Sequence, residues 1–144
     1  MRLRYVVSAC LAGIACRYDG RATPCSAVMR LMEEGRAVAA CPECLGGLPT
    51  PRLACELLGS RVVNKNGEDV TAAFLHGAQA ATALARQNGC NAAILKSRSP
   101  SCGCGQIYDG TFTGTLREGN GLWADELRRA GITLFTEERL PRDE

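Results

Sequence analysis

The sequence predicts an α/β domain with a mostly parallel sheet and covering helices, a Rossmann-like three-layer arrangement in a single compact domain. Short apolar runs that suit buried strands alternate along the chain with amphipathic segments that suit helices. With 144 residues, 46% of them hydrophobic, the chain can bury one core and has little room for a second. We therefore expect residues 1–144 to form one domain, with right-handed crossovers between its parallel strands.

The expected elements of the N-terminal part are two strands and one helix. Residues 3–7 are apolar and rich in β-formers, which predicts a buried strand followed by a loop. Residues 24–34 carry apolar side chains at helical spacing and stop at Gly35, which predicts a helix with a glycine cap. Residues 37–40 are again short and apolar, so they predict a second strand that ends before Pro42.

The middle of the chain is rich in residues that interrupt regular structure. Residues 46–52 read Gly-Gly-Leu-Pro-Thr-Pro-Arg and predict an ordered loop rather than a linker. Residues 61–63 resemble a strand that enters a tight turn at residues 64–67, where Asn and Gly tolerate positive φ. This pattern predicts a small hairpin around that turn.

The C-terminal part repeats the alternation of helix and strand. Residues 71–87 form one apolar helical face and predict a long helix. Residues 91–95 predict a third buried strand, and the polar residues 96–105 that follow it predict a functional loop. Residues 121–130 and 132–135 predict the last helix and the last strand.

The composition favours a soluble cytoplasmic protein with metal or redox chemistry. Nine cysteines are far above ordinary usage, and in a reducing compartment they indicate metal binding or redox work rather than a disulfide framework. The single histidine, His76, leaves almost no material for a mixed zinc site, and it falls off the apolar face of its helix, towards solvent. No segment resembles a signal peptide or a membrane helix, and the net charge of +2 is too small to indicate nucleic acid or a membrane surface as partner.

Three cysteines follow three of the expected strands. Cys10 comes after the first strand, Cys41 after the second and Cys102 in the loop after the third. Because loops beyond the carboxyl ends of parallel strands converge, we expect these thiols at one edge of the sheet, as thiolate ligation of an iron–sulfur cluster requires. The sequence has a single CxxC pair, Cys41 and Cys44, while Cys102 and Cys104 are spaced CxC, so a zinc ribbon is disfavoured.

Six ordered blocks span nearly the whole chain and carry a family resemblance. They are residues 8–11 (SACL), 16–20 (CRYDG), 41–43 (CPE), 46–52 (GGLPTPR), 96–103 (KSRSPSCG) and 107–112 (IYDGTF). Together these blocks resemble the thiouracil desulfidase family. Six blocks in order are far more specific than any one of them.

The resemblance implies a 4Fe-4S cluster held by Cys10, Cys41 and Cys102, with the fourth iron open. The implied reaction is a non-redox, hydrolytic desulfuration of a thiolated pyrimidine base or nucleoside of the 2-thiouracil or 4-thiouridine type. It replaces C=S by C=O and releases hydrosulfide through the open iron. The implied partner is this small molecule alone, with neither nucleic acid nor membrane required, and the protein is expected to be a monomer or a small homo-oligomer.

The resemblance also implies an acid–base pair, a carboxylate at Glu43 and a serine at Ser99 or Ser101. Glu43 would deprotonate the water that attacks the C=S carbon, and Ser99 would relay a proton to the ring nitrogen or steady the adduct. Five further residues are expected to contact and orient the substrate, namely Arg17, Arg52, Lys96, Arg98 and Tyr108.

Two questions stay open from the residues themselves. Cys44 or Cys104 can replace a neighbouring ligand or add a fourth thiolate, which would make the cluster structural or electron-transferring. A thiol oxidoreductase using Cys41 and Cys44, and a non-catalytic cysteine-rich metal-binding module, are the rival functions. The redox pair is disfavoured because its thiolate needs a helix N-terminus, and the two glycines at 46–47 argue against a helix there.

The other cysteines have plainer expected roles. Cys55 and Cys90 flank apolar segments and are expected to be small buried hydrophobes. Cys16, close to Cys10 in sequence, is either a pocket wall or a spare thiol.

Overall fold

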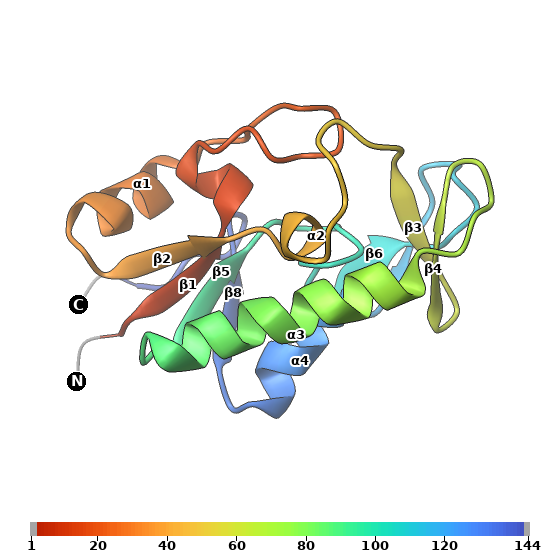
Figure 1. Ribbon diagram of the computed structural model, residues 1–144. Coiled ribbons are helices and arrows are strands. Elements are labelled where there is room, and N and C mark those ends of the chain that lie inside the picture. Colours follow the sequence, from red (N-terminus) through yellow and green to blue (C-terminus); the bar gives the residue numbers. More distant parts are fainter. Residues whose placement is uncertain (1–2, 143–144) are drawn as a thin grey trace.

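A parallel sheet forms the centre of the molecule in the computed structural model, which describes residues 3–142 (Figure 1). Its strands run in the order β2 (Ala37–Ala40), β1 (Tyr5–Ser8), β5 (Ala92–Leu95) and β8 (Thr133–Thr136), and all neighbours are parallel. In the register, Tyr5 stands opposite both Ala37 and Ala92. The predicted mostly parallel sheet is confirmed.

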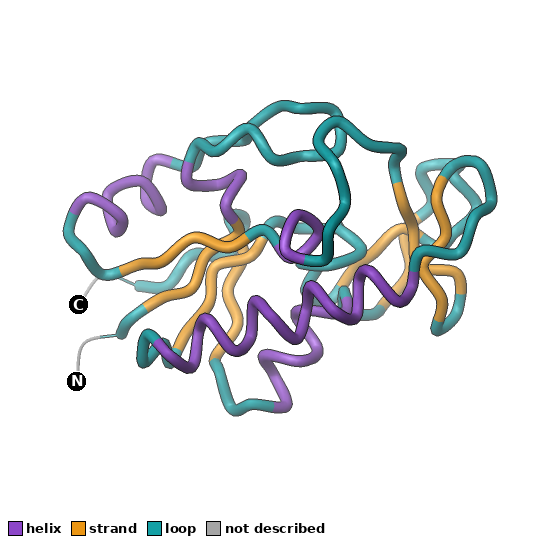
Figure 2. Tube along the Cα trace, in the orientation of Figure 1, coloured by secondary structure: helices purple, strands orange, loops and turns teal. Residues whose placement is uncertain are grey.

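Helices cover both faces of this sheet, as the three-layer prediction requires (Figures 1 and 2). One face carries α1 (Ser26–Glu33) and the 3-10 turn η1 (Ala9–Ala12), and the other carries α3 (Thr71–Gln87) and α4 (Leu122–Arg129).

The two central strands, β1 and β5, are mostly apolar and fully buried because both faces of the sheet are covered there. Val7 and Ile94 pack with Val28 on the α1 side. Val6 packs with Trp123 on the side of α3 and α4. Successive side chains of a strand therefore pack into the core on opposite faces of the sheet.

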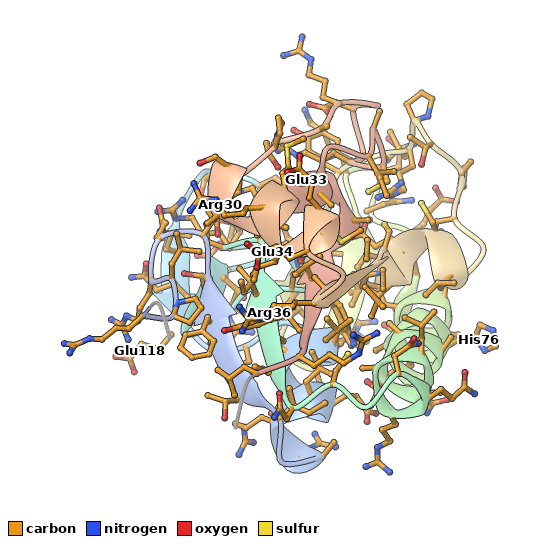
Figure 3. The ribbon with its side chains drawn as sticks, turned by 90° about the vertical axis from the view of Figure 1, so that its left-hand side faces the viewer. Arg30, Glu33, Glu34, Arg36, His76 and Glu118 are labelled. Atoms are coloured by element: carbon orange, nitrogen blue, oxygen red, sulfur yellow. The ribbon has the colours of Figure 1, made fainter. Side chains whose placement is uncertain are left out.

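The predicted elements of this central domain occur within one to two residues of their expected bounds. The long helix predicted over residues 71–87 is found over those residues as α3. His76 lies on its exposed side and points outward (Figure 3), as expected from its place on the helix. No helix within residues 3–142 is long and apolar enough to cross a membrane.

The predicted hairpin is present, but its turn lies elsewhere. Strand β4 (Arg61–Asn64) pairs antiparallel with β3 (Cys55–Leu58), which precedes it, so the hairpin turns at Gly59. The expected turn at residues 64–67 does form, but it leads only to an isolated bridge between Val63 and Asp69. The alternative pairing wins because β3 offers four residues in register.

Several elements were not predicted, among them two strands and a short helix near the cavity. The strands β6 (Gln106–Tyr108) and β7 (Leu116–Glu118) form a second small antiparallel sheet. A one-turn helix, α2 (Pro42–Leu45), begins directly after Cys41, although two glycines follow it. Our expectation of no helix there was wrong, because proline suits the first helical turn and Gly46 adopts helical angles where it meets α3.

Candidate functional site

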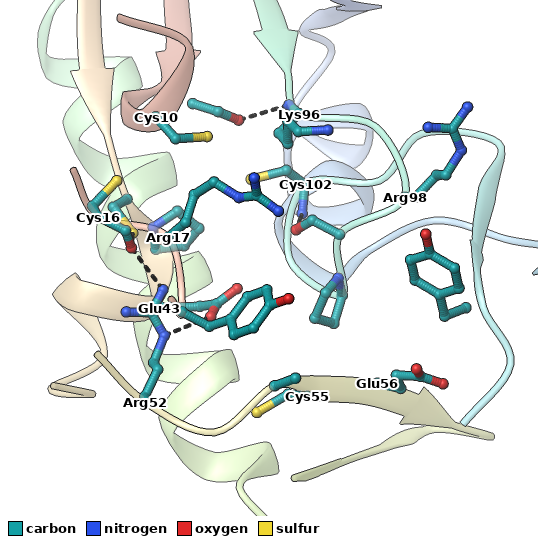
Figure 4. A pocket seen from close by; sticks show the side chains of 18 of the residues that line it. Cys10, Cys16, Arg17, Glu43, Arg52, Cys55, Glu56, Lys96, Arg98 and Cys102 are labelled. Atoms are coloured by element: carbon teal, nitrogen blue, oxygen red, sulfur yellow. Dashed lines mark hydrogen bonds and ion pairs between the residues drawn. The ribbon is translucent and has the colours of Figure 1, made fainter. Parts of the chain in front are cut away.

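A cavity of about 400 Å³ opens beyond the carboxyl ends of β1, β2 and β5 (Figure 4). Cys10 reaches it from η1, Cys41 from the residue that precedes α2, and Cys102 from the loop after β5. The structure thus brings together in one cavity the three thiols that the strand order placed at one edge.

The three thiols are free and partly or fully buried. All nine cysteines are free thiols, with Cys10 and Cys102 buried and Cys41 half-buried. Within residues 3–142, no group of three or more His, Cys, Asp or Glu side chains stands close enough to hold one metal ion. In an iron–sulfur cluster each thiolate binds a different iron, so its ligands are spread around a larger object.

Each of the three thiols also has a side chain that can donate a hydrogen bond to it. Burial raises the pKa of Cys10, and the Thr23 hydroxyl beside it acts in the opposite direction. Burial likewise raises the pKa of the Cys102 thiol, and the hydrogen bond with the Ser8 hydroxyl lowers it by a smaller amount. Thr23 Oγ1 is buried and has no other partner within residues 3–142, so it is free to serve a Cys10 thiolate.

Cys41 has Cys16 as its neighbour. The hydrogen bond from the Cys16 side chain lowers the pKa of Cys41 to about 6, and the same contact raises the pKa of Cys16. In the neutral form the Cys41 thiol donates to the Cys16 carbonyl oxygen at 3.8 Å. Cys16 is buried in the cavity, so of its two expected roles the structure selects the pocket wall.

Of the remaining cysteines, Cys44 is exposed and does not line the cavity, but its side chain contacts Cys41 as well as Thr50 Oγ1, the latter at 3.5 Å. Cys104 lines a second cavity that adjoins the first at Ser97 and Arg98. Cys90 is buried as expected, but Cys55 is half-buried and lines the main cavity, where burial raises its pKa to about 11.

Glu43 presents its carboxylate to the cavity from α2. Its side chain is 14% exposed, and Arg52 Nε donates to its Oε1 at 2.9 Å (Figure 4). Ser101 Oγ donates to its Oε2 at 3.2 Å. The carboxylate is therefore held from two sides, by residues nine and 58 positions away in sequence.

The two candidate serines have different surroundings. Ser99 lines the cavity, and its hydroxyl oxygen accepts the backbone N–H groups of Ser101 and Cys102 at 3.1 and 2.8 Å. These two bonds leave the Ser99 proton available to another acceptor. Ser101 is 2% exposed and lies behind the wall, where its hydroxyl serves Glu43.

Among the four cations expected to contact the substrate, three are already paired, Arg52 with Glu43 as described above and two others with glutamates near the C-terminus. Lys96 Nζ lies 2.9 Å from Glu137 Oε2, and Arg98 Nη2 lies 2.8 Å from Glu138 Oε2. Both cations still line the cavity, as does Arg17, which stacks on Tyr18 and has no ion pair within residues 3–142.

The outer part of the cavity is built by the two small antiparallel sheets. Tyr108 of β6 lines it, as expected for a substrate contact. Glu56 of β3 also lines it and accepts the backbone N–H groups of Gly110 and Phe112 at 3.0 and 3.1 Å. Glu56 thus fixes the turn of β6–β7 over the cavity.

Comparison with known proteins agrees with this arrangement. A family model described as 2-thiouracil desulfurase matches residues 5–139. The chain belongs to this family. The family resemblance seen in the six sequence blocks is thereby confirmed.

Two members illustrate how far the likeness extends. The uncharacterized protein YbbK of Bacillus subtilis (strain 168) is 41% identical over 145 residues, covering 94% of this chain and 96% of YbbK. A solved structure named 4Fe-4S-dependent thiouracil desulfidase TudS is 46% identical, with a TM-score of 0.92 over 97% of this chain and 94% of that one.

In this 2-thiouracil desulfurase family member, sequence reasoning left the role of Cys16 open between a pocket wall and a spare thiol, and it missed Glu56, which also shapes the site. Both belong to or touch blocks that carried the resemblance: Cys16 opens the CRYDG block, and Glu56 binds the turn of the IYDGTF block. The sequence blocks indicated which segments build the site, but only the folded loops show which of their side chains face the cavity.

Proposed function

We propose that this protein holds a 4Fe-4S cluster through Cys10, Cys41 and Cys102 and removes the sulfur of a thiolated pyrimidine, replacing C=S by C=O with release of hydrosulfide. The observation that carries the proposal is the meeting of three thiols from three strand ends with one anchored carboxylate in a single cavity. The name of TudS, which shares the fold and 46% of aligned residues, supports the cofactor and the reaction.

The residues present fit such a cluster. Each of the three cysteines has a nearby hydroxyl or thiol donor, and hydrogen bonds to ligand sulfurs are a common way in which proteins support a cluster. When bound through three cysteines, the cluster supplies one iron without a protein ligand, a Lewis acid that can polarise a C=S group. Neither Cys44 nor Cys104 lines the cavity, although Cys44 contacts Cys41 from outside it, and we therefore assign the cluster three ligands.

The chain itself provides the acid–base groups. Glu43 accepts a proton from water that adds to the C=S carbon, and its carboxylate is already oriented for this by Arg52 and Ser101. Ser99 donates a hydrogen bond to the ring nitrogen and steadies the adduct, because its oxygen is held by two backbone N–H groups and its own proton is left without an acceptor within residues 3–142. Ser101 acts behind the wall, through Glu43.

Substrate orientation falls to the remaining polar side chains of the wall. Arg17 lines the cavity, has no ion pair among the described residues and can donate to an oxygen of the pyrimidine. Lys96, Arg98 and Tyr108 face the same space. A volume of about 400 Å³ accepts a base or a nucleoside of the 2-thiouracil or 4-thiouridine type, because small-molecule sites begin near 300 Å³. The free thiols support a reducing, cytoplasmic setting for this chemistry.

The test is anaerobic reconstitution with iron and sulfide, followed by hydrosulfide release from 2-thiouracil and 4-thiouridine. Cys10→Ala, Cys41→Ala and Cys102→Ala are expected to lose the cluster absorbance and the activity. Cys44→Ala and Cys104→Ala are the matched controls and are expected to retain both. The ligand assignment is wrong if a control loses the cluster while one of the three retains it.

The same experiment separates the rival functions. A structural metal module would bind iron but release no hydrosulfide. A redox pair at Cys41 and Cys44 would reduce a disulfide substrate without iron and would lose this activity in Cys44→Ala. The short helix after Cys41 and the lowered pKa of that thiol are the observations that favour this second candidate.

A further inference from the structure

Arg52 is almost completely buried at the edge of the cavity, with its side chain 6% exposed. Its guanidinium donates to Glu43 Oε1 at 2.9 Å, to the Cys16 carbonyl at 2.8 Å, to the Pro49 carbonyl at 3.1 Å and to Thr50 Oγ1 at 2.9 Å. An arginine has five N–H donors, and four of them are used by acceptors of the protein itself. Little of this guanidinium is left to contact a substrate.

The partners of Arg52 lie on the two segments that frame the cavity. Pro49 and Thr50 belong to its own loop, whereas Cys16 belongs to the loop that follows η1. The backbone repeats this connection, because the Arg52 N–H donates to the Tyr18 carbonyl at 2.8 Å. Arg52 therefore fastens the two loops to each other and the Glu43 carboxylate to both.

Glu43 depends on this anchor for its orientation. It stands on a helix of one turn, and a glutamate side chain has three rotatable bonds. Ser101 holds one oxygen by a single hydrogen bond of 3.2 Å, and the shorter contact to Arg52 is the charged one. Without Arg52 the carboxylate would keep one neutral contact and could rotate into several rotamers.

We propose that Arg52 is a positioning residue: it acts on the reaction through Glu43, by holding that carboxylate at the cavity wall beside the loop of Cys16, rather than by contacting the substrate. The proposal rests on the proposed function, in which Glu43 takes the proton from water. It also reassigns Arg52 within the site, because its donors point into the protein.

The test compares Arg52→Gln, Glu43→Gln and the double variant in the cluster-loaded protein with 2-thiouracil. Removal of a group that orients a ligand or base typically costs about 10- to 100-fold. We expect kcat of Arg52→Gln to fall by about that factor while KM stays within about threefold. If Arg52 acts through Glu43, the double variant is no slower than Glu43→Gln alone. Multiplicative losses, or a rise in KM alone, would overturn the proposal.

Arg36→Gln is the matched control for loss of a partly buried arginine. Arg36 stacks on Tyr5 and lies 3.7 Å from Glu34, at the other end of the sheet (Figure 3). Its variant is expected to retain wild-type kcat and iron content. Should Arg52→Gln not accumulate as folded protein, Arg52→Lys replaces it in the cycle, because lysine keeps the charge but not the fork of donors.

A second readout does not depend on turnover. Carbodiimide coupling of carboxylates, mapped by mass spectrometry, is expected to label Glu43 several-fold faster in Arg52→Gln than in the wild type or in Arg36→Gln. Unchanged labelling would overturn the proposal, whatever the activity. Wild-type protein that binds a cluster but releases no hydrosulfide would instead refute the proposed function, and the labelling result would still decide whether Arg52 holds Glu43.

Discussion

Gly77 lies in the middle of α3, where this helix passes closest to α2. A Cβ atom built on Gly77 would stand 1.7 Å from the Pro42 carbonyl oxygen and 2.7 Å from its carbonyl carbon. Real Cβ contacts stay above 3.0 Å, so Gly77→Ala must open this gap by at least 1.3 Å, the difference between 3.0 and 1.7 Å. The atoms in the way are backbone, which cannot swing aside.

Two opposing effects decide the outcome of Gly77→Ala. Alanine favours the helix by about 1 kcal/mol over glycine. Overpacking costs about 1–3 kcal/mol, and contact with backbone places this case at the upper end. The net expectation is a loss of about 2 kcal/mol, which corresponds to about 4–8 °C in Tm for a protein of this size. Because the displaced helix carries Glu43 and follows Cys41, hydrosulfide release should also fall by about 100-fold for a shift of this order.

Thermal unfolding followed by circular dichroism measures the stability difference. Ala80→Gly on the same helix is the control, because no close contact opposes it and propensity alone predicts a loss of about 1 kcal/mol. If Gly77→Ala raises Tm by about as much as Ala80→Gly lowers it, helix propensity alone decides the effect of a substitution at residue 77. The reasoning from the close approach of α2 and α3 would then be refuted.

Three further variants or measurements test other parts of the site. Glu137→Gln should cost about 1–2 kcal/mol at pH 7. Burial pushes the pKa of Glu137 up, but Lys96 and a backbone N–H outweigh burial and leave that pKa lowered, so the stabilisation is present above the ordinary value of 4.5. It is lost as the pH falls through the lowered pKa, so urea unfolding over a pH series should show the deficit at pH 7 and its gradual disappearance towards low pH. Thr23→Val removes the hydroxyl beside Cys10 at nearly constant side-chain volume, and the loss of iron to a chelator should become about tenfold faster than in the wild type. Equal rates in the two proteins would contradict a supporting role of the Thr23 hydroxyl. Burial raises the pKa of Cys55 to about 11, so only about 10⁻³ of this thiol is ionised at pH 8. The rate of its alkylation, measured by peptide mapping, should therefore rise with pH up to pH 11. A plateau of the rate near pH 9 would show an ordinary thiol.

The parts of the fold that could be predicted are those whose residues bury a regular pattern. Residues 92–95 are fully apolar because β5 is covered on both faces, and α3 shows a helical face over its whole length. The strands β6 and β7 carry no such signal. Most of their side chains are exposed or half-buried, so hydrogen bonding to each other, not burial, defines them.

The same distinction applies to the site. Cys10, Cys41 and Cys102 could be placed together because each follows an expected strand, and the carboxyl ends of parallel strands lie at one edge of the sheet. The partners of Glu43 were not predictable, since they come from a loop and from a position 58 residues away. Pairings of this kind depend on how two loops close on each other, and no local pattern of residue types encodes that.

The surroundings of the cavity determine whether its thiols are protonated. Burial raises the pKa of Cys10 and Cys102, so both stay neutral thiols while nothing compensates a buried negative charge. Lys96 and Arg17 lower the pKa of Cys10 too weakly to reverse this. The hydroxyl donors are in place, but they stabilise a thiolate only once it exists. If Cys10 and Cys102 hold the cluster as proposed, binding of iron would supply the missing positive charge and release the thiol protons, so that loading of the cluster would be coupled to deprotonation of these two cysteines.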